Sequence, residues 1–259
     1  MSDLDALDAL VAEGWIDRVL QPVKSGKEAN VYMCRGGVRS GESLVAAKVY
    51  RSTQQRGFAA DAAYREGDER RMSRRVRVAM AKRSTFGRQA RFGRWIEREH
   101  EALALLSETG AVVPRAIALS SGALVLEWIG DEDGAAPPLR HVRLPAESAE
   151  AVLESLLDQI RLFLTCDLVH GDLSEYNVLW WGGRTVVIDF PQAVDPRFNR
   201  SARSLLERDV RNLCRHFERY GLVHQPERIA ARLWSAWMRG DLRYATVGPE
   251  DWPPGAPVE

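Results

Sequence analysis

The segment His170–Asn177, with the sequence HGDLSEYN, holds the residue types best suited to catalysis, and we call it the catalytic loop. Asn177 follows Asp172 by five residues, and Asp189 ends the next apolar run. Phosphoryl transfer requires a carboxylate that orients the attacking hydroxyl or water, and oxygen ligands that hold magnesium against the β- and γ-phosphates. The spacing therefore predicts that Asp172 is catalytic and that Asn177 and Asp189 bind magnesium. The alternative is a polar turn between a helix and a hairpin.

Phosphoryl transfer also requires a cation on the nucleotide phosphates, and Lys48 is the candidate. It lies in the apolar run VAAKVY, which matches the Val-Ala-Ile-Lys strand of protein kinases. A lysine in a strand is more often a solvated edge residue, but this one follows a glycine turn and precedes the catalytic loop. Its expected partner is a glutamate on the first long helix of the small lobe. Three glutamates qualify, and we predict Glu99 in preference to Glu97 or Glu101.

The segment Lys24–Tyr32, KSGKEANVY, is the candidate for covering the phosphates, and we call it the glycine turn. It contains a single glycine, Gly26, so it is not a GxGxxG loop. Nor is it a Walker A loop, because Glu28 stands where that motif requires Ser or Thr after the lysine. From the residues alone, a generic hairpin turn and a phosphate cradle both remain open.

Four motifs closely resemble those of the RIO family of atypical protein kinases. They are SGKEANVY at 25–32, HGDLSEYN at 170–177, IDFPQ at 188–192, and RDVRNL at 208–213 with the HF and YG pairs that follow it. The resemblance extends from residue 15 to residue 222. The aminoglycoside and choline phosphotransferases share His-Gly-Asp, a following Asn and a later Ile-Asp. They do not share the Ser-Gly-Lys-Glu-Ala and Ser-Glu-Tyr sequences found here.

The resemblance implies a site for ATP and Mg²⁺. In it Asp172 would be the catalytic acid/base residue, and Lys48 would contact the α- and β-phosphates. Asn177 and Asp189 would be the magnesium ligands. The residues that line the triphosphate would be Ser25, Gly26, Lys27 and Glu28.

The resemblance also implies an adenine site and a second role for one aspartate. The sequence LEWI at 126–129 is similar to the family's Met-Glu-Phe-Ile hinge, so backbone groups of Glu127 and Ile129 would meet adenine. Asp189 would itself receive the phosphoryl group as a transient acyl phosphate. A carboxylate beside the γ-phosphate is positioned to act as a nucleophile, although a bound metal blunts it.

One departure from the family concerns the phosphate geometry, and two differences from ordinary protein kinases concern the acceptor. Lys24 stands where the family usually has Ser or Thr, and Ser174 stands where ordinary protein kinases carry a lysine beside the γ-phosphate. The segment from Asp189 to Arg208 is short and lacks Ala-Pro-Glu, so the platform for docking peptides is expected to be missing. We therefore expect ATP hydrolysis or self-phosphorylation to exceed transfer to generic peptides. The first 20 residues are too few for the winged helix of one RIO branch, which favours a short, prokaryotic-like form.

The elements that must position these residues follow from periodicity and from Gly and Pro signals. Helices are expected at 3–20, 95–107, 146–166, 201–220 and 226–239. Strands are expected at 20–23, 31–34, 44–50, 115–119, 123–129, 178–181 and 185–190. Strands dominate the first half and helices the second, which predicts an α+β, two-lobed protein-kinase-like fold.

The domain prediction places an N-terminal helix and a β-rich N-lobe at 1–129, with a basic loop at 51–94. A hinge at 130–138, rich in Gly, Ala and Pro, leads to a mainly helical C-lobe at 139–244. The remaining residues, 245–259, are expected to be a disordered tail.

Residues 65–98 carry twelve basic side chains against four acidic ones. This stretch is either a surface that contacts rRNA or a ribosomal subunit, or a solvated loop whose charge balances acids elsewhere. The family's association with ribosome maturation favours the first interpretation. The zero net charge of the whole chain favours the second.

Composition limits the remaining classes. With 45% hydrophobic and 28% charged residues the chain is typical of a globular protein. Three scattered cysteines and no long apolar run predict a cytoplasmic protein without a disulfide framework or a membrane span. The main interpretation is a RIO-type Ser/Thr kinase or ATPase acting on a protein substrate or on itself. The alternatives are a small-molecule phosphotransferase and a slow nucleotide-dependent switch that binds RNA or the ribosome.

Overall fold

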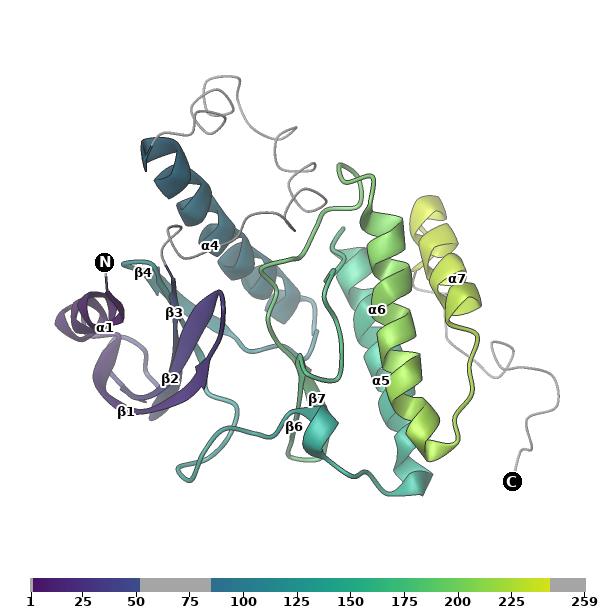
Figure 1. The fold of residues 1–259 in the computed structure, drawn as a ribbon, viewed down its shortest axis with the longest axis horizontal. Coiled ribbons are helices and arrows are strands. Elements are labelled where there is room, and N and C mark those ends of the chain that lie inside the picture. Colours follow the sequence, from purple (N-terminus) through teal and green to yellow (C-terminus); the bar gives the residue numbers. More distant parts are fainter. Residues whose placement is uncertain (1, 52–84, 243–259) are drawn as a thin grey trace. The chain divides into compact units, whose positions relative to one another are not determined.

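The computed structural model describes residues 2–51 and 85–242, and it divides into two compact units (Figure 1). The described part of the first unit comprises residues 2–51, 85–107 and 114–136, and that of the second comprises 108–113 and 137–242. The chain thus passes to the second unit within the segment predicted as a hinge. Most of the basic stretch 65–98 and the whole predicted tail 245–259 lie outside the described residues.

The first unit is built on a five-stranded antiparallel sheet with the order β1-β2-β3-β5-β4. Its strands are β1 (Ile16–Ser25), β2 (Ala29–Gly36), β3 (Leu44–Tyr50), β4 (Ala116–Ser120) and β5 (Ala123–Glu127). Two helices accompany the sheet, α1 (Asp3–Ala12) and α4 (Thr85–Glu108). The core gathers apolar residues of α1 and of the strands, among them Leu10, Val45 and Val125, each without exposed surface.

The predicted helix at 3–20 is wrong in its second half. The helix starts at a capping box formed by Ser2 and Asp5, and it ends at Ala12. Gly14 then adopts a positive φ of 78°, and the ten residues from Ile16 to Ser25 pair with β2 as strand β1. Strand pairing with a distant segment therefore overrides the helical spacing of apolar residues there. The helix predicted at 95–107 also begins earlier, at Thr85.

The second unit is mainly helical. It contains η3 (Leu139–His141), α5 (Ala146–Thr165), α6 (Ala202–Phe217), η4 (Glu218–Tyr220) and α7 (Pro226–Arg239), with the hairpin β6 (Val178–Trp181) and β7 (Arg184–Val187). Apolar residues recur along α5 at helical spacing and are buried, and Phe163 packs edge-on against Phe190 with 5.4 Å between ring centroids. The α+β class, with strands in the first unit and helices in the second, is confirmed.

The segment 108–113 belongs to the second unit, although the prediction assigned it to the N-lobe. The Val112 N–H donates to Oε1 of Gln159 at 2.7 Å, and the Val112 carbonyl accepts from the Val187 N–H at 2.9 Å. These bonds fasten the segment to α5 and to the hairpin. Among the described residues, no helix combines the length and the apolar character that crossing a bilayer requires.

Candidate active site

The hairpin β6–β7 determines how the catalytic loop lies relative to Asp189. Val178 pairs with Val187, so the residues just outside this pair also lie side by side. The Ile188 N–H donates to the Asn177 carbonyl at 2.9 Å. Since Asp189 follows Ile188 directly, the hairpin brings Asn177 and Asp189 to the same end of the two strands, as the motif spacing predicts. Asp189 has a positive φ of 73°, a conformation that a non-glycine residue rarely adopts.

Hydrogen bonds within the catalytic loop fix Asp172 beside these residues. The Asn177 side-chain Nδ2 donates to the Asp172 carbonyl at 2.8 Å. The Asp172 N–H donates to Nδ1 of His170 at 3.3 Å, which assigns the proton of that ring to Nε2. His170 Nε2 lies 3.1 Å from the Ile188 carbonyl, so the buried imidazole bridges the loop and the end of the hairpin.

Asp209 on α6 holds the backbone of the catalytic loop through hydrogen bonds. Its side chain is 1% exposed, and its two carboxylate oxygens accept from the N–H groups of Gly171 at 2.8 Å and Leu173 at 2.9 Å. Neighbouring Arg208 donates to the Gly171 carbonyl, and Asn212 Nδ2 donates to the Leu173 carbonyl at 3.0 Å. The residues flanking Asp172 are therefore held by helix α6 on both sides. Burial outweighs these bonds and raises the pKa of Asp209 to about 7.

Replacing Asp209 with asparagine should loosen this anchor. The amide offers one acceptor oxygen, so one of the two backbone N–H groups would lose its partner, at a cost of about 1–3 kcal/mol. We expect denaturant unfolding to show this loss most clearly on the acidic side of pH 7, together with slower turnover. Glu207→Gln is the matched control, since that residue lies on the same helix and forms only an exposed pair with Arg203. If Glu207→Gln lowered stability and turnover as much as Asp209→Asn, Asp209 would not be the anchor of the catalytic loop.

The raised pKa of Asp209 also predicts a pH dependence. The folded chain holds this proton more tightly than the unfolded chain, in which the carboxyl has its ordinary pKa near 4. The group therefore contributes most to stability below about pH 4, and the contribution is lost as the pH rises through about 7. As the pH rises from about 4 to about 7, the difference in unfolding free energy between the wild type and Asp209→Asn should become smaller. A difference that widens toward pH 7 would contradict the assignment.

Asp172 lies in a mixed electrostatic environment. Asp172 is exposed to solvent, yet partial desolvation by the surrounding protein raises the pKa of its carboxyl above the ordinary value. The positive charge of Arg208 opposes this shift, and the negative charge of Asp189 adds to it. A raised pKa suits a residue that accepts a proton from an attacking hydroxyl, because transfer is most effective when the pKa approaches the working pH.

The residues at the hairpin end fit a hard cation. The Asn177 side chain donates through Nδ2 to the Asp172 carbonyl and also bonds the Asp172 carboxyl, and its amide Oδ1 is an oxygen that could bind a cation. Together with the Asp189 carboxylate it supplies oxygen donors, the type that magnesium prefers. Among the described residues, no three His, Cys, Asp or Glu side chains cluster as a metal site. Magnesium that keeps several waters and also binds phosphate oxygens needs no more than one or two protein ligands.

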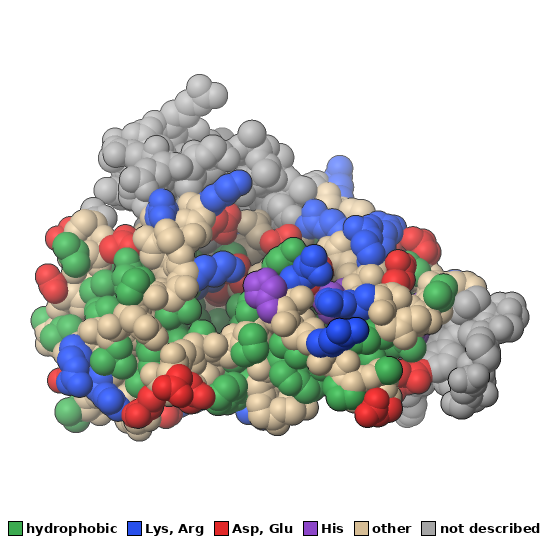
Figure 2. Space-filling view, turned by 60° about the horizontal axis from the view of Figure 1, so that its bottom comes forward, with side chains coloured by type: hydrophobic (Ala, Val, Ile, Leu, Met, Phe, Trp, Pro, Cys, Tyr) green, Lys and Arg blue, Asp and Glu red, His purple; other side chains and the backbone are tan. Residues whose placement is uncertain are grey.

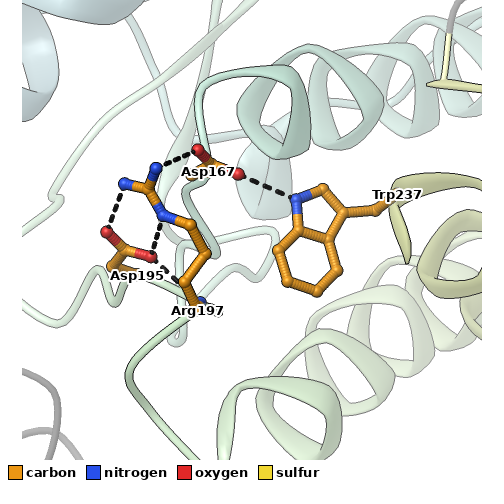
Figure 3. A network of polar contacts seen from close by, with 4 residues as sticks. All are labelled: Asp167, Asp195, Arg197 and Trp237. Atoms are coloured by element: carbon orange, nitrogen blue, oxygen red, sulfur yellow. Dashed lines mark hydrogen bonds and ion pairs between the residues drawn. The ribbon is translucent and has the colours of Figure 1, made fainter. Parts of the chain in front are cut away.

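A polar network fastens the segment that follows Asp189 (Figure 3). The Arg197 guanidinium forms ion pairs of 2.7 Å with both Asp195 and Asp167, and Trp237 Nε1 donates to Asp167 at 2.9 Å. Asp167 lies in the turn after α5, and Trp237 lies on α7. The backbones of Val169 and Val194 exchange two hydrogen bonds of 2.9 Å next to this network. The start of the catalytic loop and the segment after Asp189 are thus joined.

In the first unit, Lys48 of β3 pairs with Glu99 of α4. The Lys48 Nζ lies 2.7 Å from Oε1 and 3.0 Å from Oε2 of Glu99, and the Tyr50 hydroxyl donates to Oε2. Lys48 is 8% exposed and Glu99 is 1% exposed. Of the three glutamates considered from the sequence, Glu99 is therefore the one that accepts from the buried lysine.

The glycine turn joins β1 and β2 and is held from both ends. The Gly26 N–H donates to the Ala29 carbonyl at 2.9 Å, and a Cβ atom at Gly26 would lie 3.0 Å from that carbonyl oxygen. The Ser25 hydroxyl donates to Oδ1 of Asn30 at 2.9 Å, and Arg51 donates to both groups. The turn is therefore tight and preorganised, and Arg51 adds a positive charge beside it.

The predicted adenine contacts lie at the end of β5. The Glu127 N–H donates to the Arg115 carbonyl at 2.9 Å, and the Ile129 carbonyl accepts from the Ala136 N–H at 2.9 Å. Both groups are thus already used within the first unit. A contact with adenine would have to use the Glu127 carbonyl and the Ile129 N–H, which is a complementary acceptor and donor.

The predicted site residues therefore fall into two sets, one in each unit. Asp172, Asn177 and Asp189 lie together in the second unit, and the remaining predicted residues belong to the first. Arg208 and Asp209 belong to the motif at 208–213, but the motif by itself predicts no role for them at the site. An acidic residue at the centre of an otherwise apolar helix face is the signal that could have identified Asp209.

Comparison with known proteins identifies the family. A model of the RIO domain matches residues 30–229. The RIO-type serine/threonine-protein kinase Rio1 of Haloferax volcanii is 34% identical over 216 residues, which cover 83% of this chain and 69% of the relative. Rio1 of Thermoplasma acidophilum is 30% identical over 190 residues, which cover 73% of this chain and 93% of the relative.

A shorter match relates the chain to a human protein. Serine/threonine-protein kinase RIO3 of Homo sapiens is 36% identical over 129 residues, which cover 49% of this chain but 25% of the relative. The matches to both archaeal proteins extend over most of this chain, and the family model includes Lys48, the catalytic loop and Asp189. The chain therefore belongs to the RIO family and is an atypical serine/threonine protein kinase.

Proposed function

We propose that the chain transfers the γ-phosphoryl group of magnesium-ATP, with Asp172 as the residue that orients and deprotonates the acceptor. The observation that carries this proposal is the second unit's arrangement, in which the hairpin and Asp209 hold Asp172 beside Asn177 and Asp189. Asn177 and Asp189 would hold magnesium. Bound there, the metal would neutralise charge on the β- and γ-phosphates.

The first unit would hold the nucleotide. Lys48, oriented by Glu99, would contact the α- and β-phosphates, and the glycine turn from Ser25 to Glu28 would cover the triphosphate. The tight, hydrogen-bonded form of this turn supports the assignment, because a preorganised cradle loses little conformational entropy on binding. The Glu127 carbonyl and the Ile129 N–H would contact adenine.

The acceptor would be a serine or threonine of a protein substrate, or a group on the enzyme itself. The short connection between Asp189 and helix α6 supports limited docking of peptides, and Ser174 in place of a lysine removes one positive charge from the transition state. In the self-directed reaction an Asp189 oxygen would attack the γ-phosphorus, ADP would leave, and water would then hydrolyse the acyl phosphate. Action on a ribosomal particle through residues 65–98 is supported by their basic sequence alone.

Turnover of γ-labelled ATP by the full chain tests this proposal. We expect slow, magnesium-dependent release of phosphate or self-labelling that exceeds labelling of generic peptides, and loss of turnover in excess EDTA. A label on Asp189 should be released by hydroxylamine and should be absent from Asp189→Asn, whereas Asp195→Asn serves as a matched control on the same segment. Faster transfer to an aminoglycoside or to choline than to any protein would contradict the proposal.

A further inference from the structure

A pocket in the second unit lies apart from the predicted catalytic residues. It has a volume of about 460 Å³, and its lining residues are Arg143, Leu144, Ala146, Arg219 and Tyr220. These residues come from the segment before α5, the first turn of α5, and η4 after α6. The pocket therefore lies where the start of one long helix meets the end of another.

Two arginines give this pocket its charge. Arg143 and Arg219 are both exposed, and within the described part of the chain neither guanidinium pairs with a carboxylate. Arg219 lies over the Tyr220 ring at 5.6 Å, a contact that orients it without neutralising it. Other arginines of this unit, such as Arg197 and Arg203, have acidic partners. Two uncompensated guanidinium groups in one hollow attract an anion, and phosphate oxygens suit their fork of donors.

The first turn of α5 adds backbone donors to the same pocket. This helix is 20 residues long, and its N-cap residue, Pro145, provides no side-chain hydrogen bond to the first turn. Ala146, whose N–H has no partner within the helix, lines the pocket. The dipole of a long helix adds partial positive charge at this end. Glu147 lies in the same turn but does not line the pocket.

The wall around Tyr220 is already in place. The Tyr220 hydroxyl accepts from the Leu144 N–H at 3.1 Å and lies 3.5 Å from the Val142 carbonyl. The buried ring of His216 packs against Tyr220 with 6.4 Å between centroids. Because these contacts hold the wall around Tyr220, binding a ligand would cost little conformational entropy there.

The pocket is connected to the catalytic loop through η3. The Arg140 N–H donates to the Glu175 carbonyl at 3.1 Å, and its Nε donates to the Tyr176 hydroxyl at 3.2 Å. Three residues after Arg140 the chain reaches Arg143 and the pocket. Figure 2 shows Lys and Arg side chains gathered to the right of centre on one face, beside a histidine. Because Arg143 follows η3 closely in the chain, a segment bound in the pocket would lie near Arg140, which contacts the catalytic loop.

We propose that this pocket binds the phosphoryl group of a phosphoserine or phosphothreonine in a protein segment. A phosphoryl dianion can engage both guanidinium groups and the helix N-terminus at once, whereas a carboxylate offers one charge and two oxygens. A segment anchored here would have neighbouring residues near η3, which contacts the catalytic loop. The pocket would thus favour partners that are already phosphorylated. Binding of a phosphorylated segment is a further property, beyond the proposed phosphoryl transfer, and it does not require the chain to turn over ATP.

Binding of a labelled peptide to the full chain tests the pocket. The probe is a short neutral peptide with one phosphoserine, compared with the same peptide carrying serine, by fluorescence anisotropy at low salt. The phosphopeptide should bind at least about tenfold more tightly, since it gains charge-assisted hydrogen bonds. The double variant Arg143→Gln/Arg219→Gln should lose this difference, while Arg203→Gln, at the far end of α6, should keep it.

Two further measurements separate this site from the nucleotide site and from free phosphate. The double variant should retain its affinity for magnesium-ATP, whether or not the chain proves to be an active kinase. Inorganic phosphate should compete only at concentrations well above those of the phosphopeptide. The proposal is overturned by equal binding of the two peptides, by undiminished phosphopeptide binding to the double variant, or by free phosphate that competes as well as the phosphopeptide.

Discussion

Replacing Asp172 with asparagine is expected to lower the rate of ATP turnover by about 10²–10⁴-fold while the affinity for magnesium-ATP stays nearly unchanged. The amide keeps the size of the side chain but cannot accept a proton from the attacking group. The loop should keep its conformation, because the hydrogen bonds of the residue 172 backbone to Asn177 and His170 are retained. The amide oxygen can also still accept from the Asn177 side chain, which bonds the Asp172 carboxyl in the wild type. Turnover under saturating ATP, together with calorimetric titration of nucleotide, measures the two effects separately.

Glu175→Gln is the matched control for this substitution. It removes the same charge from the same loop, and the hydrogen bond of Glu175 with the Arg140 N–H uses its backbone carbonyl. We expect turnover within a few-fold of the wild type. If Asp172→Asn kept near-normal turnover, Asp172 would be a structural residue, and the proposed role would have to be abandoned.

Replacing Lys48 with methionine is expected to destabilise the first unit by about 3–5 kcal/mol, because it leaves the Glu99 carboxylate buried without its cation. It should also weaken the binding of magnesium-ATP about tenfold or more, since a charge-assisted phosphate contact contributes about 1.5–3 kcal/mol. Denaturant unfolding and calorimetry measure the two losses.

A double variant separates stability from nucleotide binding. Lys48→Met/Glu99→Gln removes both charges and keeps an acceptor for the Tyr50 hydroxyl, so it should regain most of the lost stability. The affinity for nucleotide should stay low, because the cation is still missing. Arg115→Met breaks an exposed pair with Glu42 in the same unit and should cost less than about 1 kcal/mol. Normal nucleotide affinity in the double variant would remove Lys48 from the binding site.

Helix geometry in the sequence is sufficient to select Glu99 as the partner of Lys48. Successive residues of a helix are about 100° apart, so Glu97 and Glu101 point away from the face that carries Glu99. Glu99 lies three residues after Ile96 and four before Leu103, both buried, and thus on the apolar stripe. A glutamate within such a stripe needs a buried partner, and the lysine 51 residues earlier supplies it.

The helix predicted for residues 13–20 is wrong because strand pairing is not a local property. Ile16 continues the helical spacing of the apolar residues before it, and the local sequence offers only Gly14 against a helix. The strand forms because β2 provides a partner from Ile16 onward, and that partner lies beyond the reach of a local pattern. The same limit applies to Asp209, which meets Gly171 and Leu173 across 38 and 36 residues of chain.

The sequence by itself determined the family and the order of most elements, because the family's motifs are short and helical or strand periodicity is local. It also predicted which residues carry the chemistry, since the reaction limits the residue types and their spacing. Only the tertiary structure decided that Asp209 anchors the catalytic loop and that Arg143 and Arg219 share one pocket. The two arginines are 76 positions apart, and neither lies in a motif. Their meeting depends on how α5 packs against α6, which is a sum of many weak apolar contacts that no short stretch of sequence records.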